Sequence, residues 1–175
     1  MTSSPMPTRS YSRPRRIQAS DGVSEFDCGQ PELDEWLRRY ALNNQKSGMS
    51  SVFVSIAEER VAGYYALSTG GVEPDDVPSR VRKGVPRHAV PVLLLARLAV
   101  DKAFQGTGLG KALVMDALRR VDTVATEVGV RALLIHSKDS AARDFYMHLA
   151  EFEPSPVDDL QLFLLMKDLR KALNP

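Results

Sequence analysis

The sequence predicts an α/β protein in which helices flank a mixed β-sheet. Three features predict it: an almost continuous apolar stretch at residues 91–100, a glycine-rich turn at residues 105–110, and an amphipathic helix after that turn. A strand covered on both faces gives such an apolar stretch. A second strand and helix follow at residues 130–149. A strand–helix–strand crossover implies parallel pairing with a right-handed connection.

Composition is that of a single globular domain. A chain of 175 residues with 43% hydrophobic and 26% charged residues is long enough to bury a core. It has no apolar run of about 20 residues and no secretory signal, so we expect a cytoplasmic protein with no membrane contact. The single cysteine, Cys28, excludes an internal disulfide, and the three scattered histidines do not suggest a metal site.

The amino terminus is expected to be a disordered basic leader over residues 1–14, with one domain over residues 15–175. The leader is rich in serine, proline and arginine. Residues 1–20 carry four arginines and no acid, which leaves the rest of the chain slightly acidic. The basic leader either contacts phosphate groups or is simply solvated.

The first expected helix runs from residue 31 to about residue 42. Pro31 suits a first helical turn, and acidic residues follow it at the positive end of the helix. Residues 43–48 are polar and are expected to turn the chain out of the helix. Residues 51–57 and 61–68 then read as a β-hairpin with a short turn.

A proline-rich, irregular loop is expected over residues 72–89, before the central strand. Its second half contains Arg80, Arg82, Lys83 and Arg87 and no acid. Such a loop beside an active site would guide an anionic substrate, and the alternative is an ordinary solvated loop. The later elements are expected in this order: a helix closed by residues 126–129, a strand at 130–137, a helix from 139 or 140 to about 149, a strand at 160–167 and a frayed tail at 168–173.

The turn after the central strand has glycines at alternate positions, Gly106, Gly108 and Gly110. Glycine lets the backbone approach a ligand closely, and a helix start presents unpaired N–H groups at its positive end. This arrangement suits phosphate groups. The spacing is neither that of a Walker loop nor that of a dinucleotide-binding turn. The alternative is a strand-to-helix turn with no ligand.

The turn resembles the Q-x-x-G-x-G/A pyrophosphate loop of the GNAT N-acetyltransferases. The resemblance implies the GNAT fold, a mainly antiparallel mixed sheet with one parallel, splayed pair of strands, and it implies acetyl-CoA (coenzyme A) as cofactor. The residues that would bind the cofactor are Leu98, Ala99, Val100, Gln105, Gly106, Thr107, Gly108, Leu109, Gly110, Lys111, Asp139, Ala142 and Phe145.

Tyr146 ends the pattern A-x-x-F-Y, and in GNAT enzymes this tyrosine points at the cofactor sulfur. Attack of an amine on a thioester expels a thiolate, and a phenol can donate a proton to it. Tyr146 is therefore the predicted general acid, with a half-buried structural tyrosine as the alternative. No strong base is required, because an α-amino group has a pKa of about 7.7–8.0. Backbone N–H groups near residues 98–100 would bind the thioester oxygen if that strand separates from its neighbour.

A narrower resemblance is to the GNAT toxins of bacterial toxin–antitoxin pairs. It extends over about residues 26–169 and rests on blocks at residues 26–29, 33–37, 63–67, 97–101 and 152–156. It implies acetylation of the α-amino group of the amino acid on charged tRNA, which inhibits translation. It also implies a homodimer and a ribbon–helix–helix antitoxin as partners. Two features depart from the pattern: Asp139 replaces the usual asparagine, and residues 150–152 replace the usual Gly-Phe.

A tRNA substrate requires arginine and lysine contacts to phosphate. The candidates are Arg80, Arg82, Lys83, Arg87, Arg97 and Lys102. Arg97 interrupts an apolar strand, so a structural arginine at a sheet edge is an equal alternative. Trp36 is interpreted as a core residue rather than a platform for base stacking, and Cys28 as a small buried hydrophobe rather than a nucleophile. The alternative functions are acetylation of a small amine or a protein N-terminus, and a CoA-binding regulatory module without catalysis.

Overall fold

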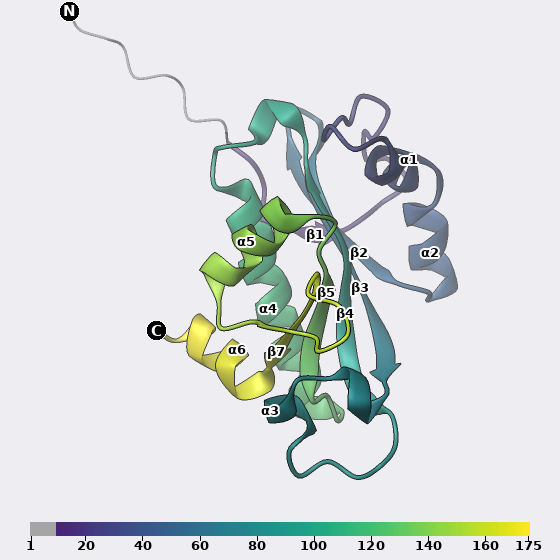
Figure 1. The fold of residues 1–175 in the computed structure, drawn as a ribbon. Helices are drawn as coiled ribbons and strands as arrows, with labels where there is room; N and C mark the ends of the chain where they lie inside the picture. Colours follow the sequence, from purple (N-terminus) through teal and green to yellow (C-terminus); the bar gives the residue numbers. More distant parts are fainter. Residues whose placement is uncertain (1–9) are drawn as a thin grey trace, which may run out of the picture.

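The computed structural model describes residues 10–175, which form one seven-stranded sheet covered by helices (Figure 1). The strand order is β1-β2-β3-β4-β5-β7-β6, and among these strands β4 and β5 are the parallel pair. This confirms the predicted mixed, mainly antiparallel sheet. The strands are β1 (Arg15–Arg16), β2 (Ser51–Ala57), β3 (Arg60–Val72), β4 (Val90–Val100), β5 (Ala132–His136), β6 (Glu153–Pro154) and β7 (Gln161–Leu165).

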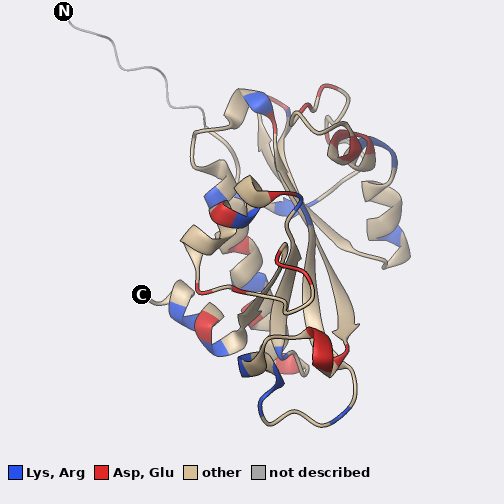
Figure 2. Cartoon of the chain, viewed as in Figure 1, with Lys and Arg blue, Asp and Glu red and all other residues tan. Residues whose placement is uncertain are grey.

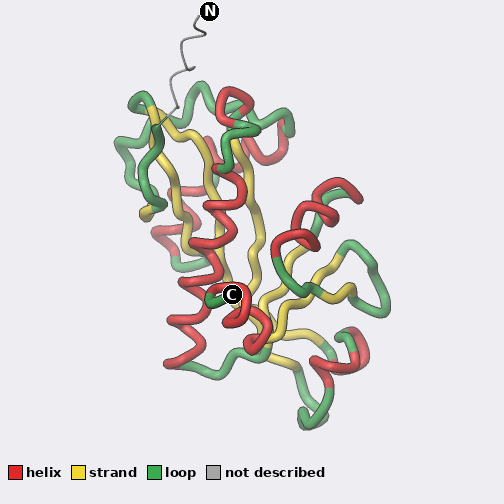
Figure 3. The backbone as a smooth tube through the Cα atoms, turned by 90° about the vertical axis from the view of Figure 1, so that its left-hand side faces the viewer, coloured by secondary structure: helices red, strands yellow, loops and turns green. Residues whose placement is uncertain are grey.

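Helices pack on both faces of the sheet. One face carries α4 (Leu109–Glu127), α5 (Ser140–Leu149) and α6 (Met166–Leu173), and Figure 3 views the sheet from that side. The other face carries α1 (Pro31–Arg39), α2 (Ala41–Ser47) and the short α3 (Ser79–Arg82). Short 3₁₀ turns lie at Pro74–Asp76 (η1) and Lys102–Phe104 (η2). Successive apolar side chains of the central strands point to opposite faces of the sheet and so contribute to the core on both sides. This is expected for a sheet packed between two layers of helices.

The predicted first helix is two helices, and the predicted polar turn over residues 43–48 is wrong. The chain bends at Tyr40 and continues as α2 until Gly48, whose φ of +77° ends the helix. Ala41 is fully buried, and the Gln45 side chain accepts a hydrogen bond from Val52 N–H (2.8 Å). These contacts with β2 stabilise a helix whose polar residues simply face outward.

The predicted last strand ends earlier than expected. Pairing of β7 stops at Leu165, and residues expected as the end of a strand and a frayed tail form α6. Leu169 is fully buried and Met166 nearly so, because both belong to the core cluster under α4. Tertiary packing therefore stabilises a short helix that the local sequence leaves marginal.

Part of the expected leader is held against the sheet. Residues 1–9 lie outside the described residues. Ser12 donates its N–H to Ile56 O (2.8 Å) and accepts from Ile56 N at its hydroxyl (2.9 Å). Tyr11 packs against the main core cluster, and Pro14 O accepts from Arg120 (3.0 Å). Residues 11–14 therefore contact the folded domain, where the sequence predicted a disordered leader, because a neighbouring strand edge satisfies backbone groups of Ser12.

Among residues 10–175, no helix has the length and apolar character needed to cross a bilayer.

Candidate active site

The two parallel strands separate half-way along β4. Pairing with β5 runs from Val92–Ala132 to Leu95–Ile135 and stops there, whereas β4 continues to Val100 with β3 alone beside it. The register with β3 shifts opposite residues 95–97, so Ala96 is the extra residue of a bulge. A bulge bends its strand and changes which way the following side chains face. In the described part of the chain, no strand therefore pairs with residues 96–100 on the side toward β5, and a ligand can bind the main chain there except at Val100 O, which accepts from the Gln105 side chain.

A cavity of about 310 Å³ occupies the gap between these strands. Its walls come from the open half of β4, the end of β5, the first turns of α1 and one face of α5. The lining residues are Cys28, Gln30, Glu32, Leu33, Leu95, Ala96, Arg97, Leu98, Ala99, Val100, Gln105, His136, Lys138, Ala142 and Tyr146. A largely preformed concavity beyond the carboxyl ends of parallel strands is a common position for a ligand.

Tyr146 brings its side chain from α5 to this cavity. The residue is only 7% exposed, and its ring makes edge contacts with Phe145 (5.3 Å between centroids) and Phe152 (6.2 Å). Burial raises the pKa of the phenol to about 12. The hydroxyl is therefore protonated at neutral pH and can donate a hydrogen bond or a proton into the cavity.

The glycine turn has the backbone conformation that anion binding requires. Gly106 and Gly108 have φ of +76° and +91°, which side chains with a Cβ rarely adopt. A Cβ added to either glycine would meet no atom within 4 Å, so conformation rather than crowding requires glycine there. The first helical hydrogen bond of α4 runs from Ala112 N to Gly108 O (3.0 Å). The N–H groups before it point out of the helix end, where the macrodipole is positive.

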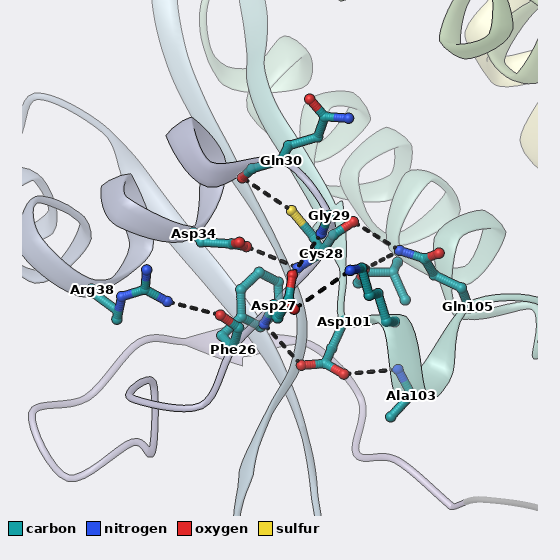
Figure 4. Close-up of polar contacts among 12 residues, drawn as sticks. Phe26, Asp27, Cys28, Gly29, Gln30, Asp34, Arg38, Asp101, Ala103 and Gln105 are labelled. Atoms are coloured by element: carbon teal, nitrogen blue, oxygen red, sulfur yellow. Dashed lines mark hydrogen bonds and ion pairs between the residues drawn. The ribbon is translucent and has the colours of Figure 1, made fainter.

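Asp101 holds this turn in place (Figure 4). Its carboxylate, only 3% exposed as a residue, accepts hydrogen bonds from Ala103 N (2.8 Å), Asp27 N (3.1 Å) and Arg60 (3.1 Å). The Gln105 side chain donates to Val100 O (2.8 Å) and Cys28 O (3.0 Å). The end of β4, the glycine turn and the segment before α1 are therefore tied to one another.

Residues 15–152 match the acetyltransferase (GNAT) family. The chain belongs to this family. A tRNA-acetylating toxin from Mycobacterium tuberculosis is 49% identical over 164 residues, which cover 94% of this chain and 98% of the relative. AtaT complexed with acetyl-methionyl-tRNAfMet has a TM-score of 0.84 and 25% identity, over 93% of this chain and 98% of that one. AtaTR bound with acetyl-CoA has a TM-score of 0.78 and 26% identity, over 95% and 98%.

The protein is thus a GNAT acetyltransferase that uses acetyl-CoA. Its own residues fit this cofactor, because the positive-φ glycines leave the amides at the start of α4 accessible beside the open edge of β4. Of the predicted cofactor-binding residues, five line the cavity: Leu98, Ala99, Val100, Gln105 and Ala142. The Gln105 side chain donates hydrogen bonds to two main-chain carbonyls, so its role in this structure is to stabilise the turn.

The other predicted cofactor residues lie on the glycine turn, the first turn of α4 and α5, and they do not line the cavity. Thr107 donates its hydroxyl to Phe104 O inside the turn. Asp139 caps α5 by accepting from Ala142 N (2.8 Å), which is an ordinary role for an aspartate at a helix start. The Phe145 ring lies 3.5 Å from the position of a Cβ on Gly110, so it packs α5 against the first turn of α4. Binding of the cofactor by these residues remains a prediction.

The placement of the basic loop beside the active site is wrong. The loop with Arg80, Arg82, Lys83 and Arg87 precedes β4, and Lys and Arg positions are seen around α3 at the lower end of the sheet in Figure 2. The cavity is lined by residues 95–100, in the second half of β4. A strand of 11 residues separates the two ends by about 35 Å. Arg80 also forms ion pairs with Glu153 (2.6 Å) and Asp168 (3.0 Å), and Arg82 pairs with Asp75 (3.3 Å).

Two of the predicted tRNA contacts do lie at the active-site end. Arg97 lines the cavity, and its guanidinium stacks 4.2 Å from the ring centroid of Trp36. Trp36 in turn stacks on Tyr64 in the core, as its interpretation as a core residue predicts. Arg97 is therefore both a packed residue and a wall of the cavity. Lys102 follows the open strand and lies 3.6 Å from the Asp27 carboxylate.

Sequence reasoning missed the wall supplied by the segment before α1 and by the end of β5. Cys28, taken as a buried hydrophobe, is only partly buried and lines the cavity. Burial and the neighbouring Asp34 raise the pKa of its thiol to about 11, so it is a poor nucleophile at neutral pH. Glu32 and His136 also face the cavity. Polar residues at the end of the strand at residues 132–136 could have predicted this part of the wall, because ligands bind at the carboxyl ends of strands in such sheets.

Proposed function

We propose that this protein transfers the acetyl group of acetyl-CoA to the α-amino group of the amino acid on charged tRNA, and so inhibits translation as a toxin. The observation that carries the proposal is the cavity between the separated strands, into which Tyr146 brings a protonated phenol. The near-full-length similarity to a tRNA-acetylating toxin supports the choice of tRNA as acceptor.

The cofactor is positioned by main-chain groups. The amides at the start of α4, after Gly108, bind the diphosphate, since they are unpaired and lie at the positive end of a 19-residue helix. The open edge of residues 96–100 provides N–H and C=O groups for the pantetheine arm and for the thioester oxygen. Asp101 and Gln105 hold the glycine turn before α4 in a fixed position relative to the open edge of β4.

Bound acetyl-CoA supplies an acetyl thioester whose carbonyl carbon an amine attacks, so that a C–N bond forms and the C–S bond breaks. Tyr146 holds a proton at Oη and donates it to the departing sulfur, after which solvent restores the phenol. The proton lost by the amine goes to water or to one of the two acceptors in the cavity wall, Glu32 and His136. A dedicated base is unnecessary, because an α-amino group with a pKa of about 7.7–8.0 is already partly neutral.

The acceptor end of the RNA approaches the side of the cavity formed by α1. Arg97 and Lys102 lie at that end of the sheet and are the proposed contacts to its phosphates. Arg80, Arg82, Lys83 and Arg87 lie too far away to touch the aminoacyl group, and they are proposed only as contacts to more distant parts of the RNA.

The proposed assembly is a homodimer that acts in the cytoplasm, where charged tRNA is found, and that a ribbon–helix–helix antitoxin neutralises. The resemblance of five sequence blocks to GNAT toxins of toxin–antitoxin pairs supports this part of the proposal. Light scattering of the purified protein tests the homodimer. A search of the adjacent reading frames for a ribbon–helix–helix protein, followed by co-expression with it, tests the antitoxin.

The decisive experiment gives the purified protein labelled acetyl-CoA and a pool of charged tRNAs. We expect label on the aminoacyl moiety, released as an N-acetyl amino acid after mild alkaline hydrolysis, and no label on uncharged tRNA. Transfer only to polyamines or peptides would identify the alternative, a small-amine or protein N-terminal acetyltransferase. CoA binding without any transfer would leave a regulatory module.

A further inference from the structure

Arg97 is a cation held in a fixed position in the wall of the cavity. Its guanidinium lies 4.2 Å from the ring centroid of Trp36, and Trp36 stacks on the fully buried Tyr64 with 11° between the two ring planes. The Tyr64 hydroxyl donates to Leu33 O (2.7 Å), which holds α1 against the sheet. The arginine therefore rests on aromatic rings of the core, and its side chain loses little freedom when a ligand binds.

The bulge at Ala96 decides which face of the sheet Arg97 occupies. Leu93 and Leu95 belong to the core cluster under α4, whereas Arg97 and Ala99 contact the cluster under α1. In a regular strand, residues 95 and 97 would share a face, because side chains alternate. The extra residue of the bulge reverses this order. Arg97 is thus turned toward α1, the side of the cavity by which the acceptor is proposed to enter.

The guanidinium of Arg97 has no acidic partner. Among residues 10–175 it forms no ion pair within 4.0 Å, although Glu32 also lines the cavity. Arg97 is half-buried and Trp36 covers one face of its guanidinium, so the other face is available to a ligand in the cavity. Guanidinium planes stack on flat rings, and proteins that bind RNA use them to stack unpaired bases.

The geometry of the proposed acceptor supplies such a base. In charged tRNA the amino acid is esterified to the ribose of the last nucleotide, so the base of that nucleotide is one sugar ring away from the amino acid. We propose that this terminal base stacks on the free face of the Arg97 guanidinium while the amine reaches the cavity beside Tyr146. The N–H groups at the edge of the guanidinium remain available to phosphate. The inference rests on the proposed function and adds a subsite for the acceptor to it.

The test compares two forms of a charged tRNA that the wild type acetylates. One form carries its normal terminal base, and the other carries a ribose without a base at that position. Both are made by ligating a chemically aminoacylated dinucleotide to a shortened tRNA. The wild-type KM should be about five- to thirtyfold higher for the abasic form, the scale of stacking on a cation, with a similar kcat. Equal KM values would overturn the inference and leave the proposed function intact. If the wild type acetylates no charged tRNA, the proposed function fails and the inference fails with it.

Arg97→Lys separates stacking from charge, because lysine keeps the charge and lacks the plane. It should raise KM for the normal tRNA about five- to thirtyfold and leave KM for the abasic form nearly unchanged, so that the two values converge. Lys102→Gln is the matched control, since loss of a proposed phosphate contact should raise both KM values alike. The melting temperature and the affinity for CoA verify the fold of both variants. If Arg97→Lys keeps the wild-type ratio of the two KM values, the arginine does not stack on the base and the inference is wrong.

Discussion

Residues 92–95 of β4 have β3 on one side and β5 on the other, whereas residues 96–100 have β3 alone. The two halves are adjacent in sequence and mainly apolar, with Arg97 the exception. The first lies largely within the core, and the second forms a wall of the cavity. In the paired half, neighbouring strands satisfy the backbone groups. In the open half, the groups facing β5 remain for a ligand, since unpaired backbone groups bind water or substrate. The candidate active site thus lies where strand pairing stops.

The comparison predicts that variants of the open half lose activity while keeping stability. Tyr146, on α5, lines the cavity beside this half, and Tyr146→Phe removes the proposed proton donor. We expect kcat to fall about 10²–10⁴-fold, the range of general acid catalysis, with the melting temperature nearly unchanged. Radiolabelled acetyl transfer to charged tRNA and differential scanning calorimetry measure the two quantities. CoA affinity serves as the control, and full activity of the variant would contradict the assignment.

The paired half should behave in the opposite way. Leu133 lies on β5 opposite Leu93 and is fully buried. Leu133→Ala is expected to lower the free energy of unfolding by about 2–5 kcal/mol, because it leaves a cavity in the core. Urea denaturation measures this loss. Under conditions where the variant is fully folded, its kcat should be close to that of the wild type. A large fall in kcat under those conditions would contradict the difference between the two halves.

Asp101 directly follows the open half of β4, so its substitution should reduce both activity and stability moderately. Asp101→Ala removes an acceptor shared by Asp27 N, Ala103 N and Arg60. We expect a loss of about 1–3 kcal/mol, the cost of leaving buried donors unpaired, and a higher KM for acetyl-CoA. Steady-state kinetics and urea denaturation test this. A stability loss with unchanged KM would mean that Asp101 does not position the glycine turn.

The smallest effect is expected at Cys28, a wall residue without a chemical role. Cys28→Ala should change kcat by less than about threefold, because a thiol of raised pKa stays protonated and is not a nucleophile. Alkylation of the wild type by iodoacetamide should be slow at pH 8 and accelerate toward pH 11, since the thiolate forms only near its pKa of about 11. A midpoint of the alkylation rate near about pH 8.5, the usual pKa of a cysteine, would contradict the raised pKa. Reacting unfolded protein provides the reference rate.

Local patterns in the sequence predicted the elements that build the site. The apolar strand, the alternate glycines and the amphipathic helix each follow from a short stretch, and the structure has β4, the positive-φ turn and α4 there. The A-x-x-F-Y pattern predicted the tyrosine that faces the cavity. The misplacement of the basic loop was avoidable, because a loop that precedes a strand lies at the opposite end from the turn that follows it.

Contacts between distant segments decided what the sequence patterns missed. Helix α6 forms because Leu169 packs under α4, and residues 11–14 contact the folded domain because Ser12 bonds Ile56 on β2. The wall at Cys28 is held beside the cavity by hydrogen bonds that join residues 27 and 28 to Asp101, Lys102 and Gln105. Each contact joins residues far apart in the chain, so periodicity and turn preference do not report it.

The sequence by itself determined the strand–turn–helix unit, because backbone conformation and apolar periodicity are local properties. The family and the tyrosine proposed as general acid came from the resemblance of short motifs to those of GNAT enzymes. Only the tertiary structure decided that β4 and β5 separate after Leu95. The separation depends on which strand edges find partners, and hydrogen bonding between strands is fixed by the assembled sheet rather than by any one strand.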